Sequence, residues 1–146
     1  MRELVLTSLL GLLCLGWSGE QQSSARKTPA RMPVLMPAEE LRWQATEFKG
    51  VAAAVLWGNP ENESKGGELL KLDSGLAFPH HKHTYDERVL IISGTFVFIS
   101  EHREETELQP GSYYYLPADV MHASRCSAGT QCLVYSEVVP RTSVKK

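Results

Sequence analysis

The chain has 146 residues, of which 42% are hydrophobic, and this predicts one globular domain rather than a disordered chain. Lys and Arg together number 15 and Asp and Glu number 17, so the formal net charge is −2 at pH 7. This near-neutral balance excludes binding of nucleic acid or of an anionic membrane surface through bulk positive charge, and we expect neither partner.

The first 18 residues have the layout of a secretory signal peptide. Arg2 supplies a positive charge before the apolar run Leu4–Leu15, and the small residues Gly16 and Ser18 suit cleavage after residue 18. Cleavage near residue 25 is the alternative. A membrane anchor is the rival interpretation, but this run is shorter than the about 20 apolar residues that span a bilayer. We therefore expect an exported protein, periplasmic or extracellular, with no stable membrane association after cleavage.

A polar segment separates the apolar run from the predicted domain. Residues 19–33 contain Pro29 and Pro33 and are typical of a flexible linker. The folded unit is predicted over residues 34–140, and residues 141–146 are predicted to be a basic tail.

The predicted unit has a β pattern throughout. Short apolar or alternating runs occur at 41–48, 51–57, 68–73, 88–93, 95–100, 112–117 and 132–139, and turn signals such as Gly66-Gly67 and Pro110-Gly111 separate them. A short helix within 37–48 is the one alternative to a strand. Many short strands in about 105 residues predict an all-β sandwich or small barrel.

The stretch "GLAFPHHKHTYDERVLIISG" concentrates three of the five histidines of the chain. If it is a strand, His81 and His83 lie on one face, Glu87 shares their parity, and His80 points the opposite way. Two imidazoles and a carboxylate on one face are suited to a divalent transition metal. The alternative is that these histidines are ordinary packed or half-exposed side chains.

The glycines around these histidines add a second pattern. Gly75, His81, His83, Glu87 and Gly94 give the spacing G-x5-H-x-H-x3-E-x6-G, which resembles the first motif of the cupin family. Further on, "GSYYYLPADVMHASRC" resembles the second cupin motif through a glycine, a proline and a histidine, at Gly111, Pro117 and His122. Asp119 and Cys126 depart from that motif, where the family has glycine and asparagine. The stretches "LWGNP", "ISGT", "PGSYYYLPA" and "CSAGTQC" make the chain similar to small secreted cupins of the DUF4437 or ChrR-like kind.

This resemblance implies a cupin jelly-roll barrel (a double-stranded β-helix) in which four side chains hold one divalent transition metal. The implied ligands are His81, His83, Glu87 and His122. The metal can be Fe, Mn, Ni, Cu or Zn, because three imidazoles and a carboxylate suit all five. Tyr113, Tyr115 and His80 are candidates to line the pocket, although strand packing or plain exposure also explains them.

Two cysteines remain after the predicted cleavage removes Cys14. Cys126 and Cys132 flank a turn in "CSAGTQC", and an even count in an exported chain predicts a disulfide. The alternative is two free thiols near the metal.

The resemblance implies a small-molecule ligand or substrate but does not identify it. We expect an Fe(II)- or Mn(II)-type metalloenzyme, a dioxygenase-like oxidoreductase. A non-catalytic metal-binding or ligand-sensing cupin and a metal-dependent isomerase are the alternatives. The sequence leaves open whether the protein forms a homodimer.

Overall fold

The structure is a computed structural model that describes residues 32–141. The predicted signal peptide, most of the predicted linker and the last five residues lie outside the described residues. Described residues from Val34 onward belong to one compact unit. This part of the chain contains no α-helix, only two 3-10 turns, η1 (Ala38–Glu40) and η2 (Pro60–Asn62). None of its helical segments has the length and hydropathy to cross a membrane.

Strands make up most of the described residues. They are β1 (Gln44–Ala45), β2 (Val51–Gly58), β3 (Gly66–Leu72), β4 (Ala77–His81), β5 (Asp86–Ser93), β6 (Phe96–Ser100), β7 (Glu105–Leu108), β8 (Tyr113–Leu116), β9 (His122–Cys126) and β10 (Cys132–Val139).

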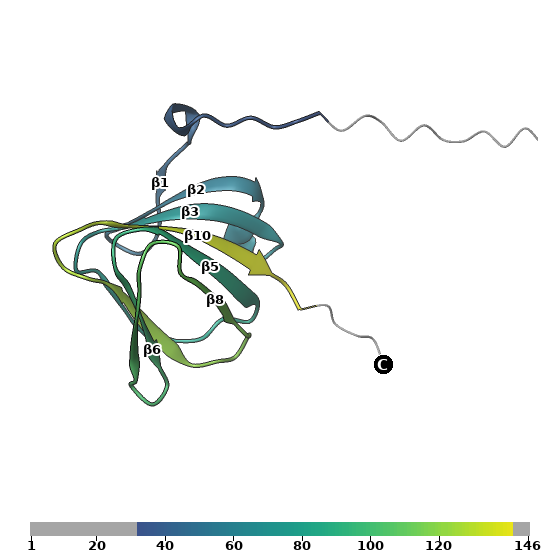
Figure 1. The fold of residues 1–146 in the computed structure, drawn as a ribbon. Coiled ribbons are helices and arrows are strands. Elements are labelled where there is room, and N and C mark those ends of the chain that lie inside the picture. The colour runs from purple at the N-terminus through teal and green to yellow at the C-terminus, as the bar shows by residue number, and fades with distance from the viewer. Residues whose placement is uncertain (1–31, 142–146) are drawn as a thin grey trace, which may run out of the picture. The chain divides into compact units, whose positions relative to one another are not determined.

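The strands form two antiparallel sheets, which confirms the predicted jelly roll. One sheet has the order β1-β2-β3-β10-β5-β8, and the other has the order β4-β9-β6-β7. Figure 1 shows β2, β3, β10, β5 and β8 side by side, with β6 in the second layer. The chain passes repeatedly from one sheet to the other, so segments that are adjacent in sequence lie on opposite walls of the barrel.

Alternation along the strands builds the core between the sheets. In β10 every second residue is buried, from Cys132 through Val134 and Ser136 to Val138. Their buried neighbours from other strands include Leu72, Val89, Ile91 and Phe96. Full burial of such an aliphatic or aromatic side chain is worth about 1.5–3 kcal/mol, so this core is the main stabilising element of the barrel.

Most predicted strands are present, and the differences lie at the edges. The predicted run 41–48 is reduced to the two-residue strand β1, and the helix alternative survives only as the turn η1. The charged run around His102 forms the tip of the β6–β7 hairpin, with an exposed His102 as expected for a solvated loop. Its second half is nevertheless the strand β7, because charged side chains are tolerated on a strand at the edge of a sheet.

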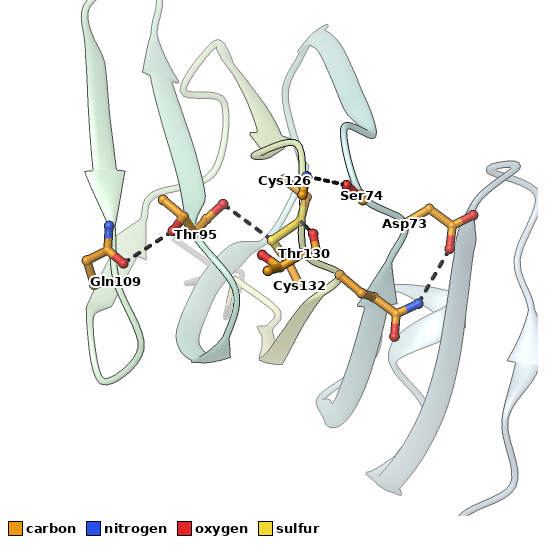
Figure 2. The surroundings of a disulfide bond; sticks show 9 residues. Asp73, Ser74, Thr95, Gln109, Cys126, Thr130 and Cys132 are labelled. Carbon is orange, nitrogen blue, oxygen red and sulfur yellow. Dashed lines mark hydrogen bonds between the residues drawn. A yellow bond between two sulfur atoms is a disulfide. The ribbon is translucent and has the colours of Figure 1, made fainter.

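Cys126 and Cys132 form the predicted disulfide, and both residues are fully buried. The closed loop is short, so its entropic stabilisation is about 2.4 kcal/mol in the chain-entropy view. Figure 2 shows the surrounding polar contacts: Thr95 donates to Gln109 at 3.2 Å, and Ser74 accepts a 2.7 Å hydrogen bond from the backbone of Gly129. The Ser74 bond ties the turn between β9 and β10 to the β3–β4 loop, and the Thr95 bond joins the two ends of the β6–β7 hairpin.

Candidate metal centre

Three histidines, from the end of β4, the loop after it and the start of β9, meet inside the barrel. His81 ends β4, His122 begins β9, and the two are direct partners in the antiparallel register. His83 reaches them from the loop after β4. One ring nitrogen of each histidine lies within 4.8 Å of the others. Imidazole nitrogens at these separations can converge on a single transition metal after small side-chain adjustments.

Glu87 approaches the histidines from the opposite sheet. It lies on β5, and its Oε2 atom is 3.7 Å from Nε2 of His83. Its Oε1 atom accepts a 2.8 Å hydrogen bond from the Ser136 hydroxyl on β10. The three histidines are therefore brought together, whereas Glu87 lies beside His83 but outside the group whose ligand atoms are all within 4.8 Å of one another. Metal binding by the predicted set of four stays a prediction.

The prediction that His81, His83 and Glu87 lie on one face of a single strand is wrong. β4 ends at His81, residues 82–85 cross to the other sheet, and Glu87 belongs to β5. The two-residue period of a strand does not continue through a loop. His83 packs against His81 and Glu87 reaches His83 through the crossing between the sheets, not through a shared strand parity.

Backbone carbonyls orient two of the imidazoles. Nδ1 of His81 lies 2.8 Å from the carbonyl oxygen of Pro79, and Nδ1 of His122 lies 3.2 Å from that of Val120. A carbonyl oxygen only accepts, so each Nδ1 carries the hydrogen and donates it. Nε2 of each ring then keeps its lone pair for a metal, which is how metal-binding histidines are commonly held.

Burial sets the charge of these groups. It lowers the pKa of His83 to about 4, with the neighbouring His81 and His122 adding to the shift. Burial also lowers the pKa of His122. The pKa of Glu87 is raised to about 7 by burial, although the hydrogen bond from Ser136 opposes the rise. Neutral imidazoles are the form that binds metals, so the donor set fits a divalent cation, whose charge would in turn stabilise the Glu87 carboxylate.

A cavity of about 820 Å³ opens onto these four side chains. Apolar and aromatic groups from both sheets form much of its wall, and several glutamates stand toward the β2–β3 loop. The residues lining it include Phe48, Phe78, Tyr85, Tyr114, Leu70, Val134, Glu61, Glu63, Glu68, Ser124 and Ser136. This volume suits a small organic molecule.

Three pocket candidates from the sequence do not line this cavity. Tyr113 and Tyr115 lie on the outer face of β8, where they are 57% and 49% exposed. The residue between them, Tyr114, points inward and lines the cavity. His80 is exposed at the outer side of β4, with its ring 3.4 Å from the carbonyl oxygen of Ser100. The pocket assignments of Tyr113, Tyr115 and His80 are therefore wrong.

The sequence contained signals for two residues that were not predicted. Tyr114 shares the parity of Leu116, an apolar residue at the end of the same strand, and Leu116 is buried. Ser136 shares the parity of Val134 and Val138 in the alternating run 132–139. The hydroxyl of Ser136 therefore lies on an otherwise apolar, buried face. A buried hydroxyl needs a hydrogen-bond partner, and this need was the signal for a polar contact at the site.

Comparisons with known proteins agree with this fold. Residues 21–139 match the family described as a domain of unknown function, DUF4437. No curated protein sequence matches the chain. The structure of KdgF from Halomonas sp. is similar over 77% of this chain and 97% of that chain, at 21% identity and a TM-score of 0.61.

Two further structures extend the likeness. The polyketide cyclase RemF from Streptomyces resistomycificus is similar over 75% of this chain and 81% of its own, with 13% identity and a TM-score of 0.65. The Rhodobacter sphaeroides complex of SigE with the anti-sigma ChrR gives 25% identity and a TM-score of 0.55, over 69% of this chain and 51% of that one. The common property of these similar structures is the cupin fold.

Proposed function

Since the chain belongs to the DUF4437 family and has the cupin fold, we propose that it is an exported metal-binding cupin that acts on a small organic molecule. Its ligands are His81, His83, Glu87 and His122, and they hold one divalent transition metal. The proposed chemistry is of the Fe(II)- or Mn(II)-dependent, dioxygenase-like kind.

The observation that carries this proposal is the cavity beside the donor set. Structural metal sites are closed by protein ligands, whereas catalytic sites leave open positions that face a cavity. Four protein ligands would leave two positions of an octahedral metal for other molecules. A bound Fe(II) or Mn(II) would supply Lewis acidity and those open positions. This arrangement favours an enzyme over a cupin whose metal only stabilises the fold.

The protein side chains have distinct roles in this proposal. The carbonyl oxygens of Pro79 and Val120 fix the rings of His81 and His122, and Ser136 orients the carboxylate of Glu87. Aromatic groups on the cavity wall, among them Phe78 and Tyr114, exclude water from the site and offer flat faces to a substrate.

Metal analysis is the first test of this function. Protein purified from its native compartment should contain about one equivalent of metal, and iron or manganese is the expected result. The Fe(II)-loaded protein should then bind nitric oxide, a probe for open coordination positions, and give the EPR signal of an iron–nitrosyl complex. Stoichiometric zinc that chelators do not remove, or Fe(II) protein that fails to bind nitric oxide, would contradict the enzymatic proposal.

Export is supported by the Cys126–Cys132 disulfide, because such bonds persist in oxidising compartments. The apolar run Leu4–Leu15 supports it independently. The mature protein should begin near residue 19 or 26 by mass spectrometry. Under denaturing conditions it should show no reactive thiol before reduction and two thiols afterwards. Two thiols before reduction would count against export.

A further inference from the structure

An ion-pair network lies on the outside of the barrel, directly behind the candidate metal ligands. Its centre is Asp119, which adopts a left-handed backbone conformation with φ of 66°. The motif that this stretch resembles has a glycine at this position. Aspartate tolerates this conformation better than most residues do, because its short side chain forms local hydrogen bonds. The backbone requirement of the turn is therefore met, and the chain gains a carboxylate there.

Asp119 is bonded to the loop that carries His83. Its backbone N–H donates a 2.8 Å hydrogen bond to the carbonyl oxygen of His83. In the same loop, Nζ of Lys82 lies 4.0 Å from Oδ1 of Asp119. His83 lies outside the strands, so ladder hydrogen bonds do not set its position. The bond from Asp119 and a hydrogen bond between Thr84 and Glu63 are the anchors of this loop on its two sides.

Arg141 closes the network from the end of the described chain. Its Nη1 atom is 3.0 Å from Oδ2 of Asp119, and its Nη2 atom donates a 2.7 Å hydrogen bond to the carbonyl oxygen of Ala118. Its Nε atom lies 3.9 Å from Oδ1 of Asp86. Asp86 also accepts hydrogen bonds from the backbone of Ala118 at 2.9 Å and from the hydroxyl of Tyr115 at 2.7 Å.

Lys82, Asp86 and the turn with Ala118 and Asp119 are close in sequence to candidate ligands, whereas Arg141 joins them from the end of the described chain. Asp86 immediately precedes Glu87, the turn containing Ala118 and Asp119 leads into His122, and Lys82 immediately precedes His83. We call Asp86, Asp119 and Arg141, with the backbone of Ala118, the outer clamp. It connects the three chain segments that present Glu87, His83 and His122 to the barrel interior.

We propose that Asp119 and Arg141 are positioning residues for the metal centre, and this inference rests on the metal binding proposed above. The side chains of both are more than half exposed, at 56% and 53%. Exposed ion pairs contribute little to stability because water and salt screen them. Their effect is therefore on the separation and orientation of the ligands. Supporting contacts behind metal ligands typically change metal affinity by about 10–100-fold.

Cobalt(II) titration of the purified mature protein tests this inference, because the visible absorption of Co(II) reports both affinity and ligand geometry. The variants are Arg141→Gln and Asp119→Gly. The glycine keeps the left-handed turn and the N–H that donates to His83, and it removes only the carboxylate. Asp119→Asn, which keeps an acceptor at the same place, serves as the conservative rescue.

The matched control is Arg125→Gln. Arg125 donates two hydrogen bonds to Glu105, at 2.6 and 2.7 Å, in an exposed pair on the four-stranded sheet that does not involve the His83 loop. We expect Arg141→Gln and Asp119→Gly to weaken Co(II) binding at least about 10-fold and to change the Co(II) spectrum. Asp119→Asn should recover part of the affinity, and Arg125→Gln should match wild type in both readouts.

Three outcomes would overturn the inference, and they are distinguishable. Wild-type affinity and spectrum in both clamp variants would reject the clamp alone. A large fall in the melting temperature of the metal-free clamp variants, with Arg125→Gln unaffected, would assign the network to folding rather than to positioning. Wild-type protein that does not bind Co(II) at all would reject the proposed metal site and the clamp together.

Discussion

The hydroxyl of Ser136 on β10 donates a 2.8 Å hydrogen bond to Oε1 of Glu87 on the neighbouring strand β5. Glu87 is nearly buried, and this hydrogen bond lowers its pKa against the larger effect of burial, which raises it. Ser136 therefore favours the ionised carboxylate and fixes its orientation, and both effects help a metal ligand.

We expect Ser136→Ala to weaken metal binding by about 10-fold or more, because supporting hydrogen bonds of this kind contribute that much to affinity. Isothermal titration with Mn(II) or Zn(II) measures the effect. Ser124→Ala is the matched control, since Ser124 is similarly buried and also lines the cavity. Equal losses in the two variants would mean that the hydrogen bond to Glu87 has no special role.

The neighbouring histidines His80 and His81 should differ completely in their contribution to metal binding. His81→Ala should lose nearly all bound metal, because it removes one member of the triad, whereas His80→Ala should keep metal content near wild type because His80 is exposed on the outside. Metal analysis of the two purified variants gives the answer. Equal losses, or loss only in His80→Ala, would mean that the register of β4 in this structure is wrong.

Removal of the metal should lower thermal stability. The four candidate ligands come from β4, the loop after it, β5 and β9 and approach one another only in the folded barrel, so a bound metal would stabilise the native state. At free metal about 100 times the dissociation constant, the gain is about 2.7 kcal/mol. For a domain of this size the shift in melting temperature is on the order of 10 °C. Calorimetry with and without chelator measures it, and His81→Ala should show no shift. A wild-type melting curve unaffected by chelation would contradict the metal site.

Glu87→Gln should stabilise the metal-free protein at alkaline pH while abolishing tight metal binding. The folded-state pKa of Glu87 is about 7, above the value of 4.5 for the free side chain. Below pH 4.5 both states are protonated, and as pH rises through 7 the folded state loses stability relative to the unfolded state. The full difference is about 3 kcal/mol, reached above pH 7.

Denaturant unfolding of metal-free wild type and Glu87→Gln at pH 5 and pH 8 tests this linkage. His83 and His122, whose lowered pKa values destabilise the fold as pH falls below about 6.5, are present in both proteins. The difference between the two proteins therefore reports the substitution at position 87, including its coupling to His83 3.7 Å away. Relative to wild type, Glu87→Gln should have a larger free energy of unfolding at pH 8 than it has at pH 5. A difference that is the same at both pH values would contradict a buried carboxylate with a raised pKa.

Gly94 should be far less replaceable than Gly75, although their φ angles are nearly equal at 79° and 77°. A Cβ atom on Gly94 would lie 2.7 Å from the carbonyl oxygen of Gln131 and 2.9 Å from Cα and Sγ of Cys132, whereas one on Gly75 would meet no atom within 4 Å. Gly75→Ala should cost about 1–2 kcal/mol from the backbone conformation alone. Gly94→Ala should cost a further 1–3 kcal/mol, roughly, from overpacking against the disulfide. Chemical unfolding of both variants measures the loss in the free energy of unfolding. Equal losses in the two variants would contradict the close packing at Gly94.

The sequence alone predicted the fold class and the disulfide, both of which the structure contains, and its resemblance to the cupin motifs named the four candidate ligands. Strand alternation, turn residues and two motif spacings are local properties of the chain, so they can be read without knowing how the sheets meet. The motif glycines Gly75, Gly94 and Gly111 adopt positive φ, a property of single turns that glycine tolerates without steric cost.

Only the tertiary structure decided how these residues face one another. Two-residue parity places Tyr113 and Tyr115 on one side of β8 and Tyr114 with Leu116 on the other, and the packing of the second sheet decides which side is the interior. Likewise, His83 and Glu87 meet through a crossing between sheets, and Ser136 reaches Glu87 across a sequence separation of 49 residues. The outer clamp joins Asp86, Asp119 and Arg141 by the same closure of the barrel. Contacts of this range depend on sheet pairing, and local sequence patterns do not encode that pairing.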